Sequence, residues 1–211
     1  KVAQKSSGHF VKVNIADHNS VSKGLDIARA RFGSERICVN CAGIAPAQKT
    51  VSKGKGHSNE LFENVLSVNL GGTFNLASQS ALEMSGLSQI NESGERGVIV
   101  NTSSIAAYEG QMGQLAYSAS KAGVLGMTLP MARDLAQHGI RVMAVAPGIF
   151  STPMVEGLPE EVQDNLATSI PFPSRLGRPE EFADLVIQIV ENSMLNGEII
   201  RLDGAVRLQP R

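Results

Sequence analysis

The chain has 211 residues, of which 42 % are hydrophobic and 18 % are charged, and this size and balance fit one globular domain with a substantial core. The formal net charge is −1 and the lysines and arginines are scattered, so the composition argues against nucleic acid or an anionic membrane surface as a partner. The apolar runs are far shorter than the roughly 20 residues that span a bilayer. Small molecules and other subunits are the expected partners.

Segments with the apolar character of strands alternate with helical patterns along the chain. The strand-like segments are 9–15, 36–40, 97–102, 140–146 and 197–202. Strands joined by helices form a mostly parallel sheet with right-handed crossovers and helices on both faces. The sequence therefore predicts an α/β fold, a doubly wound sheet of Rossmann type, in a single domain that covers residues 1–211.

Three stretches carry helical patterns. Between residues 61 and 76, apolar positions step by three and four residues along one face, which predicts a buried helical side. Residues 115–137 have helical composition over a long stretch. Pro179 is followed by two glutamates, and this is a typical helix start because proline suits the first turn and carboxylates favour the positive end of the helix dipole. That helix should end near Asn192.

Two irregular segments, 44–58 and 147–175, each follow a predicted strand. In an open α/β sheet, ligands bind outside the carboxyl ends of the strands. The two segments therefore mark the expected binding site.

The two cysteines, Cys38 and Cys41, have the CxxC spacing of some metal and redox sites. A zinc site would need a second pair of ligands, and the four histidines of the chain form no such cluster. The pair also falls at the end of a predicted strand rather than at a helix N-terminus. We predict that both are buried, reduced thiols and that the chain holds no metal.

The strongest candidate for chemistry is Ser104, with Tyr117 thirteen residues later and Lys121 four residues after the tyrosine. The i,i+4 spacing places the lysine ammonium beside the phenol ring, where a positive charge favours phenolate. Free tyrosine has a pKa of about 10 and is a poor base near neutrality, so such a neighbour would suit general acid/base work. Alone, the pair is more often part of a solvated helix face.

The surrounding segment 101–123, NTSSIAAYEGQMGQLAYSASKAG, resembles the active-site segment of the short-chain dehydrogenases/reductases. In that family the serine polarises a carbonyl, the tyrosine transfers a proton and the lysine holds the nicotinamide ribose. The resemblance implies an alcohol–ketone oxidoreductase in which Ser104, Tyr117 and Lys121 have these roles. Asn69, in LSVNLGGTF, resembles the asparagine that completes the catalytic tetrad, and a mid-helix asparagine can disturb the backbone ladder and hold a water for a proton relay.

Further segments resemble the cofactor-binding motifs of the family. Residues 40–43, NCAG, resemble the NNAG turn beside the adenosine half, and Pro147-Gly148 with Thr152 resembles the motif that binds the nicotinamide carboxamide. Asn14 stands where many members have an aspartate that accepts a hydrogen bond from adenine. By resemblance, the cofactor-binding residues are Asn14, Ile15, Asn40, Cys41, Ala42, Gly43, Tyr117, Lys121, Pro147, Gly148, Ile149, Phe150 and Thr152. The substrate-facing residues are Ser104, Gln111 and Tyr117.

The glycine-rich TGxxxGxG of the family does not occur in the chain. Its backbone amides hold the cofactor pyrophosphate at a helix N-terminus, and the second strand of the family carries the residue that selects NAD or NADP. Both would precede residue 1. We therefore expect the domain to be N-terminally incomplete, with roughly 40 further residues upstream, an estimate based on the size of a βαβ unit.

Within the family, the segments PFPSRLG and LNGEIIRLDGAVRLQP and the insertion 48–58 resemble members that act on acyl-CoA. This resemblance implies NAD-dependent interconversion of (S)-3-hydroxyacyl-CoA and 3-ketoacyl-CoA, with hydroxysteroids as further substrates and with NADP left open. One alternative is an NADPH-dependent 3-oxoacyl-ACP reductase. Another is a non-catalytic binding or assembly protein that keeps the fold.

The resemblance also implies an assembly and leaves the compartment open. Small and apolar residues in helices 61–84 and 115–137 resemble those that pair across the main dimer interface of the family, so we expect a homotetramer. We expect no membrane partner and no direct nucleic-acid binding. The compartment would be the cytoplasm in a bacterium and the mitochondrion in a eukaryote.

Overall fold

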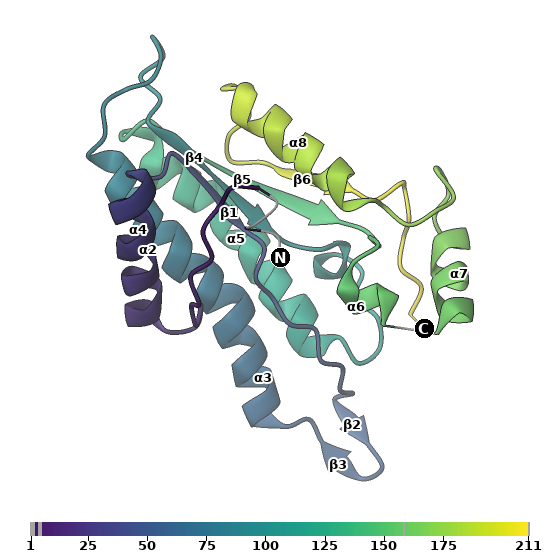
Figure 1. Ribbon diagram of the computed structural model, residues 1–211. Coiled ribbons are helices and arrows are strands. Elements are labelled where there is room, and N and C mark those ends of the chain that lie inside the picture. The colour runs from purple at the N-terminus through teal and green to yellow at the C-terminus, as the bar shows by residue number, and fades with distance from the viewer. Residues whose placement is uncertain (1–2, 4–5, 158, 211) are drawn as a thin grey trace.

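The computed structural model describes residue 3 and residues 6–157 and 159–210. Its centre is a four-stranded sheet in the order β1-β4-β5-β6, in which every neighbouring pair is parallel. The strands are β1 (Ile37–Asn40), β4 (Gly97–Thr102), β5 (Ile140–Pro147) and β6 (Ile199–Leu202). Helices cover both faces of this sheet (Figure 1), which confirms the α/β, doubly wound, mostly parallel class.

The helices lie in two layers around the sheet. On one face, α4 (Gly72–Ser85) and α5 (Leu115–Ala136) pack against the strands, and α2 (His18–Phe32) packs on α4. On the other face lies α8 (Pro179–Glu191), as Figure 1 shows. The remaining helices are α3 (Asn59–Leu66), the π-helix η1 (Ser67–Gly71), the 3₁₀-helix η2 (Ile105–Ala107), α6 (Pro153–Glu156) and α7 (Glu160–Thr168).

Residues 44–58 form an arm that runs from the turn after β1 to the start of α3. It contains a short antiparallel hairpin of β2 (Val51–Ser52) and β3 (Lys55–Gly56), which extends away from the body of the molecule in Figure 1. The backbone N–H of Gln48, at the base of the hairpin, donates to the carbonyl of Gly113 at 2.8 Å. The arm is therefore tied to the loop that precedes α5.

The core follows from the alternation of side chains along buried parallel strands. Ile99 and Val142 point toward α4 and α5, where they join Met84 and Ala132. The intervening residues point toward α8 and form a second cluster, whose buried members are Val98, Val100, Met143, Val145 and Ile189. Near-continuous apolar runs such as VIV in β4 are thus explained by burial on both faces.

One predicted strand is not formed. Residues 9–14 are irregular, Ile15 lies in a turn, and the Phe10 side chain is 76 % exposed. The segment is held by side chains instead, because Val13 lies against Gly24 and Ile15 lies against Gly72 so closely that a Cβ at Gly72 would be 2.7 Å from Ile15 Cγ2. Apolar alternation alone predicted the strand, but a strand also needs a hydrogen-bonding partner. The other four predicted strands are confirmed to within two residues at each end.

The helix predictions hold, with small shifts at the helix ends. The predicted helix 115–137 corresponds to α5, and the helix that begins at Pro179 ends at Glu191, one residue before the predicted Asn192. The apolar face between residues 61 and 76 runs through α3, η1 and the start of α4. Among the described residues, no helix is both long enough and apolar enough to cross a membrane.

Candidate active site

A cavity of about 590 Å³ opens at the carboxyl ends of β4 and β5. Its lining includes Ser104, which follows β4, and Tyr117 and Lys121 from the first two turns of α5. The segment after β5 supplies the opposite wall. The cavity therefore lies where an open parallel sheet binds ligands, and it joins residues that are far apart in the sequence.

The Ser104 hydroxyl is oriented by the backbone that follows it. Its Oγ accepts a hydrogen bond from the N–H of Ala106 at 3.1 Å and so caps the short helix η2. This bond uses a lone pair of the oxygen and leaves the hydroxyl proton available for donation to another group. Burial raises the pKa of the Tyr117 phenol, and a hydrogen bond with Ser104 partly offsets that rise.

Lys121 is buried on the same helical face as Tyr117. Its side chain is only 4 % exposed, and Nζ lies 5.8 Å from the centroid of the tyrosine ring. Nζ donates to the carbonyl oxygen of Thr102 at 2.8 Å, so the end of β4 fixes the ammonium beside the phenol. Burial lowers the pKa of Lys121 from 10.5 to about 8.

The pKa of Tyr117 moves opposite to the direction expected from the spacing. Desolvation is the largest influence and raises it, and the Ser104 hydrogen bond opposes that effect without reversing it. The i,i+4 spacing correctly predicts that the lysine and the tyrosine are neighbours. It did not account for the burial of both groups, which disfavours phenolate as well as ammonium.

Asn69 lies behind the cavity and connects three segments. It is fully buried in η1, where the helix widens to π geometry, so the helix is disturbed at this residue as predicted. Its Oδ1 accepts from the N–H of Ile44 at 2.8 Å, while Nδ2 donates to the carbonyl of Ile44 and to Ser120 Oγ. The asparagine thereby fixes the turn after β1 against α5. Its part in a proton relay stays a prediction.

The other predicted site residues divide into two groups. The cavity is lined by Cys41, Gly43, Gln111, Pro147, Gly148, Ile149, Phe150 and Thr152. It is not lined by Asn14, Ile15, Asn40, Ala42 and Asn69. Asn40 instead donates to Asn101 Oδ1 at 2.9 Å between neighbouring strands, and Asn14 Oδ1 accepts from the N–H of Ala16.

Several lining residues were not anticipated from the sequence. Thr102 acts through its backbone carbonyl, a contribution that carries no residue signature. Leu166, Phe182 and Leu208 come from α7, α8 and the end of the chain, and only the tertiary fold brings them together. Helical spacing could have indicated that α7 and α8 each have an apolar face, but not that both faces meet the cavity.

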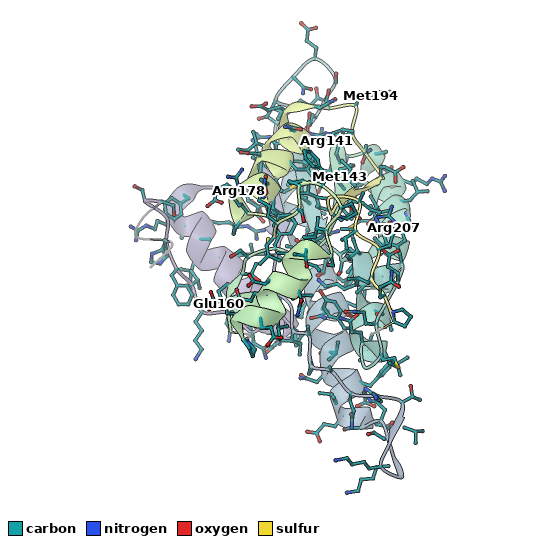
Figure 2. The ribbon with its side chains drawn as sticks, turned by 90° about the vertical axis from the view of Figure 1, so that its right-hand side faces the viewer. Arg141, Met143, Glu160, Arg178, Met194 and Arg207 are labelled. Carbon is teal, nitrogen blue, oxygen red and sulfur yellow. The ribbon has the colours of Figure 1, made fainter. Side chains whose placement is uncertain are left out.

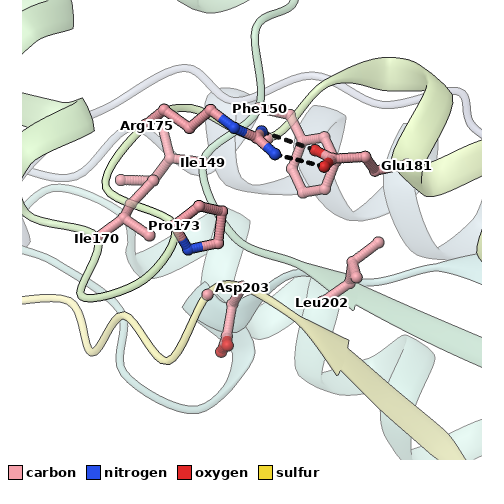
Figure 3. Close-up of a pocket in the computed structure, with 10 residues that line it drawn as sticks. Ile149, Phe150, Ile170, Pro173, Arg175, Glu181, Leu202 and Asp203 are labelled. Carbon is pink, nitrogen blue, oxygen red and sulfur yellow. Dashed lines mark hydrogen bonds and ion pairs between the residues drawn. The ribbon is translucent and has the colours of Figure 1, made fainter.

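A smaller cavity of about 140 Å³ lies beside the main one and shares Ile149 and Phe150 with it. Figure 3 shows Arg175 and Glu181 paired at its edge, with two hydrogen bonds of 2.9 and 2.6 Å between the guanidinium and the carboxylate. Its other labelled residues are mostly apolar. None of Ser104, Tyr117 and Lys121 lines it, so it is separate from the candidate active site.

The cysteines differ from the prediction at one position. Cys38 is buried in β1, as expected, whereas Cys41 is exposed and lines the main cavity. Both thiols are free. Cys41 lies beyond the carboxyl end of the strand, so it no longer alternates into the core. Over the described part of the chain, no group of three or more His, Cys, Asp and Glu side chains is placed to hold a metal ion.

Comparisons with known proteins agree with this geometry. The family model of the short chain dehydrogenases matches residues 1–163. The 3-hydroxyacyl-CoA dehydrogenase type-2 of Homo sapiens is 55 % identical over 203 residues, which cover 95 % of this chain and 77 % of that protein. The crystal structure of 3-hydroxyacyl-CoA dehydrogenase type-2 from Mycobacterium avium has a TM-score of 0.91 at 42 % identity, with 97 % of this chain and 79 % of that chain covered.

A more distant relative is the 3-oxoacyl-[acyl-carrier-protein] reductase FabG of Thermotoga maritima, which is 36 % identical over 92 % of this chain and 75 % of its own length. The chain belongs to the short-chain dehydrogenase family and is an oxidoreductase. Membership implies a nicotinamide cofactor.

Proposed function

We propose that this chain interconverts 3-hydroxyacyl-CoA and 3-ketoacyl-CoA, with the (S)-alcohol as the hydroxy substrate and NAD as the cofactor. The observation that carries the proposal is the convergence of Ser104, Tyr117 and Lys121 on one cavity of about 590 Å³. Its volume lies in the range of small-molecule and cofactor sites. The higher identity to the type-2 enzymes than to the carrier-protein reductase supports acyl-CoA over acyl-ACP as the substrate class.

The proton chemistry follows from the contacts of the three side chains. With its Oγ already accepting from Ala106, the Ser104 hydroxyl donates to the substrate oxygen and stabilises the negative charge that develops there. In the oxidation direction, the Tyr117 phenolate accepts the hydroxyl proton of the substrate; in reduction, the phenol returns it. The adjacent ammonium favours the phenolate that this step needs, against the desolvation that raises the pKa of Tyr117.

The residues of the cavity fit a nicotinamide cofactor. An ammonium has three N–H donors, and the acceptor that the described residues give Lys121 is the Thr102 carbonyl, so two donors remain for a ribose diol. Pro147, Gly148 and Thr152 line the same cavity and would hold the carboxamide. When bound, the nicotinamide accepts or supplies the hydride. Placement of the lysine between the ribose and the phenol would couple cofactor binding to proton transfer.

Steady-state kinetics test the substrate and the cofactor together. The full-length protein should reduce acetoacetyl-CoA with NADH, and kcat/KM should be lower with NADPH and with acetoacetyl-ACP. A strong preference for NADPH together with turnover of acyl-ACP alone would favour the carrier-protein reductase. Absence of turnover with either carrier, in protein that binds NADH, would favour the non-catalytic alternative.

We also propose a homotetramer. Large apolar side chains remain exposed along the two helices that were expected to pair, with Phe74 and Leu82 of α4 at 53 % and 77 % exposure and Leu129 of α5 at 42 %. Such residues on adjacent helices suit burial against a second copy. Light scattering at micromolar concentration should give four times the chain mass, and a monomer would contradict the proposal.

A further inference from the structure

The C-terminal segment 203–210 runs from the end of β6 to the loop before α5. Figure 1 shows it as the yellow trace that descends from β6 toward the terminus marked C. Two hydrogen bonds attach it to the loop: the N–H of Met112 donates to the Pro210 carbonyl, and Gln111 Nε2 donates to the Gln209 carbonyl, both at 3.0 Å. The segment and the loop therefore form one layer over the active site.

Leu208 is the member of this segment that reaches the main cavity. It also packs against a small apolar cluster, whose buried members are Ile105, Ile170 and Val206. Ile105 belongs to η2, the helix that Ser104 caps. One leucine thus belongs both to the lining of the main cavity and to the apolar cluster that includes a residue of η2.

Arg201 fastens the start of the segment. Its guanidinium donates to both carboxylate oxygens of Glu109, at 2.5 and 3.3 Å, and to Asp203 Oδ2 at 2.7 Å. It also lies 5.0 Å from the centroid of the Tyr108 ring. The Arg201 and Glu109 side chains are 23 % and 24 % exposed, so the bidentate pair is shielded from much of the solvent. The Arg201 guanidinium lowers the pKa of Glu109, and the pair therefore stays charged at neutral pH.

These contacts join the tail to the residues immediately before Tyr117. Glu109 is eight positions before the tyrosine, and Gln111 lines the cavity itself. Arg201 and Glu109 do not line the cavity, so they act on it through the segments that they hold together. A loss of this attachment would free Leu208 and Gln111 at the same time.

We propose that segment 203–210 is a wall of the substrate pocket, that Leu208 is the specificity residue that limits the acyl chain, and that Arg201 is the positioning residue that holds the wall. The inference rests on the proposed function because it takes the substrate to be an acyl-CoA. It adds which residue of this chain meets the acyl group and which ion pair keeps it there.

The first test measures chain-length preference as the ratio of kcat/KM for 3-oxodecanoyl-CoA to that for acetoacetyl-CoA. Leu208→Ala should raise the ratio on the order of ten-fold, because pocket contacts of a few methylene groups change discrimination by this amount. Leu208→Phe should lower it. Leu25→Ala, a change in α2 away from the cavity, is the matched control and should leave the ratio unchanged.

The second test uses Arg201→Gln, which removes the charge without touching the cavity. The KM for acetoacetyl-CoA should rise about ten-fold while the KM for NADH changes by less than about two-fold, because a loosened wall weakens substrate positioning. Arg201→Lys keeps one charged contact and should fall between the wild type and Arg201→Gln. A purely structural role would lower the active fraction, and hence kcat, without separating the two KM values.

The outcomes separate the inference from the proposed function. A wild-type enzyme that turns over acyl-CoA, together with folded Leu208 variants that have the wild-type ratio, overturns the inference alone. An Arg201→Gln variant that loses kcat with both KM values unchanged also overturns it. A wild-type enzyme that turns over no acyl-CoA overturns the proposed function, and the inference fails with it.

Discussion

The two ends of the parallel sheet both carry buried charged residues, and the difference lies in how completely these residues are paired. At the amino end, Arg141 of β5 donates to Glu95 and to the carbonyls of Ile189, Val190 and Leu195. Figure 2 shows Arg141 toward the end of the molecule that carries Met194, away from Glu160 on α7. At the carboxyl end, Lys121 has one backbone acceptor and faces a cavity.

This difference separates structure from chemistry. A charge whose hydrogen-bonding groups are all paired inside the protein fixes elements in place, and at the amino end it ties α8 and the following turn to the sheet. A buried charge with donors left over can bind a ligand. We therefore expect changes at the amino end to alter stability and changes at the carboxyl end to alter catalysis.

The largest effect is expected for Tyr117→Phe, which removes the hydroxyl that we propose transfers the proton and keeps the ring. The value of kcat should fall by ~10²–10⁴-fold, the usual contribution of general acid/base catalysis. Circular dichroism and the urea midpoint should stay close to those of the wild type. A variant with more than half of the wild-type kcat would remove Tyr117 from its proposed role.

At the amino end, Arg141→Met should lower the free energy of unfolding by about 3–5 kcal/mol, because it leaves the Glu95 carboxylate buried without its partner. Below the unfolding transition, kcat should be unchanged. Lys23→Met, at an exposed position in the middle of α2, is the control and should change stability by less than about 0.5 kcal/mol. A large loss of kcat in folded Arg141→Met would contradict the division between the two ends.

The same contrast explains how much of the molecule could be predicted from the sequence. Apolar runs predicted β1, β4, β5 and β6. The signal is continuous in β4 and β5, which are buried on both faces, whereas β1 alternates exposed and buried residues. The segment 9–15 carried a similar signal and formed no strand, since side-chain alternation says nothing about which backbone is available for pairing. Helix boundaries were predicted to within one or two residues at α5 and α8, where proline and the end of the periodic pattern mark them.

The site was predictable where it depends on side chains at fixed spacing. Tyr117 and Lys121 are neighbours because four residues make about one helical turn, and their motif also indicated Ser104. The Thr102 carbonyl, the Leu208 wall and the attachment of Arg201 to Glu109 were not predictable, because they depend on backbone groups or on contacts 92 positions apart in the chain. Burial of the tyrosine and the lysine, which sets the direction of both pKa shifts, likewise requires the tertiary structure.

At the carboxyl end of the sheet, the burial of Lys121 should make the free energy of unfolding depend on pH. Its pKa is about 8 in the folded chain and 10.5 as the reference value, so between these values the unfolded state binds more protons and the free energy of unfolding rises with pH. Lys121→Met removes this dependence. The free energy of unfolding of the wild type minus that of Lys121→Met should therefore increase by up to about 3 kcal/mol from pH 8 to pH 10.5. Urea titrations at a series of pH values measure this difference.

Well below pH 8 that difference should be flat, because both states of the wild type then hold the proton. Cys38 also titrates in the alkaline range, but both proteins contain it and its contribution cancels. A difference that stays constant, or falls, through the window would show that burial does not govern the protonation of Lys121. A fall would indicate instead that the folded chain stabilises the ammonium.

The smallest effect concerns the two cysteines, one inside β1 and one just after its carboxyl end. Cys38 is buried within β1, and burial raises the pKa of its thiol to about 11, whereas Cys41 lies past the carboxyl end and is exposed. Thiolate is the reactive form, so an aromatic disulfide reagent at pH 8 should label one thiol per folded chain and two in denaturant. Cys41→Ser should abolish labelling of the folded chain, and Cys38→Ser should leave it intact.

Because Cys41 lines the main cavity, saturating NADH should slow the reaction of its thiol with the reagent. An unchanged rate with bound cofactor would place the cofactor away from the turn after β1.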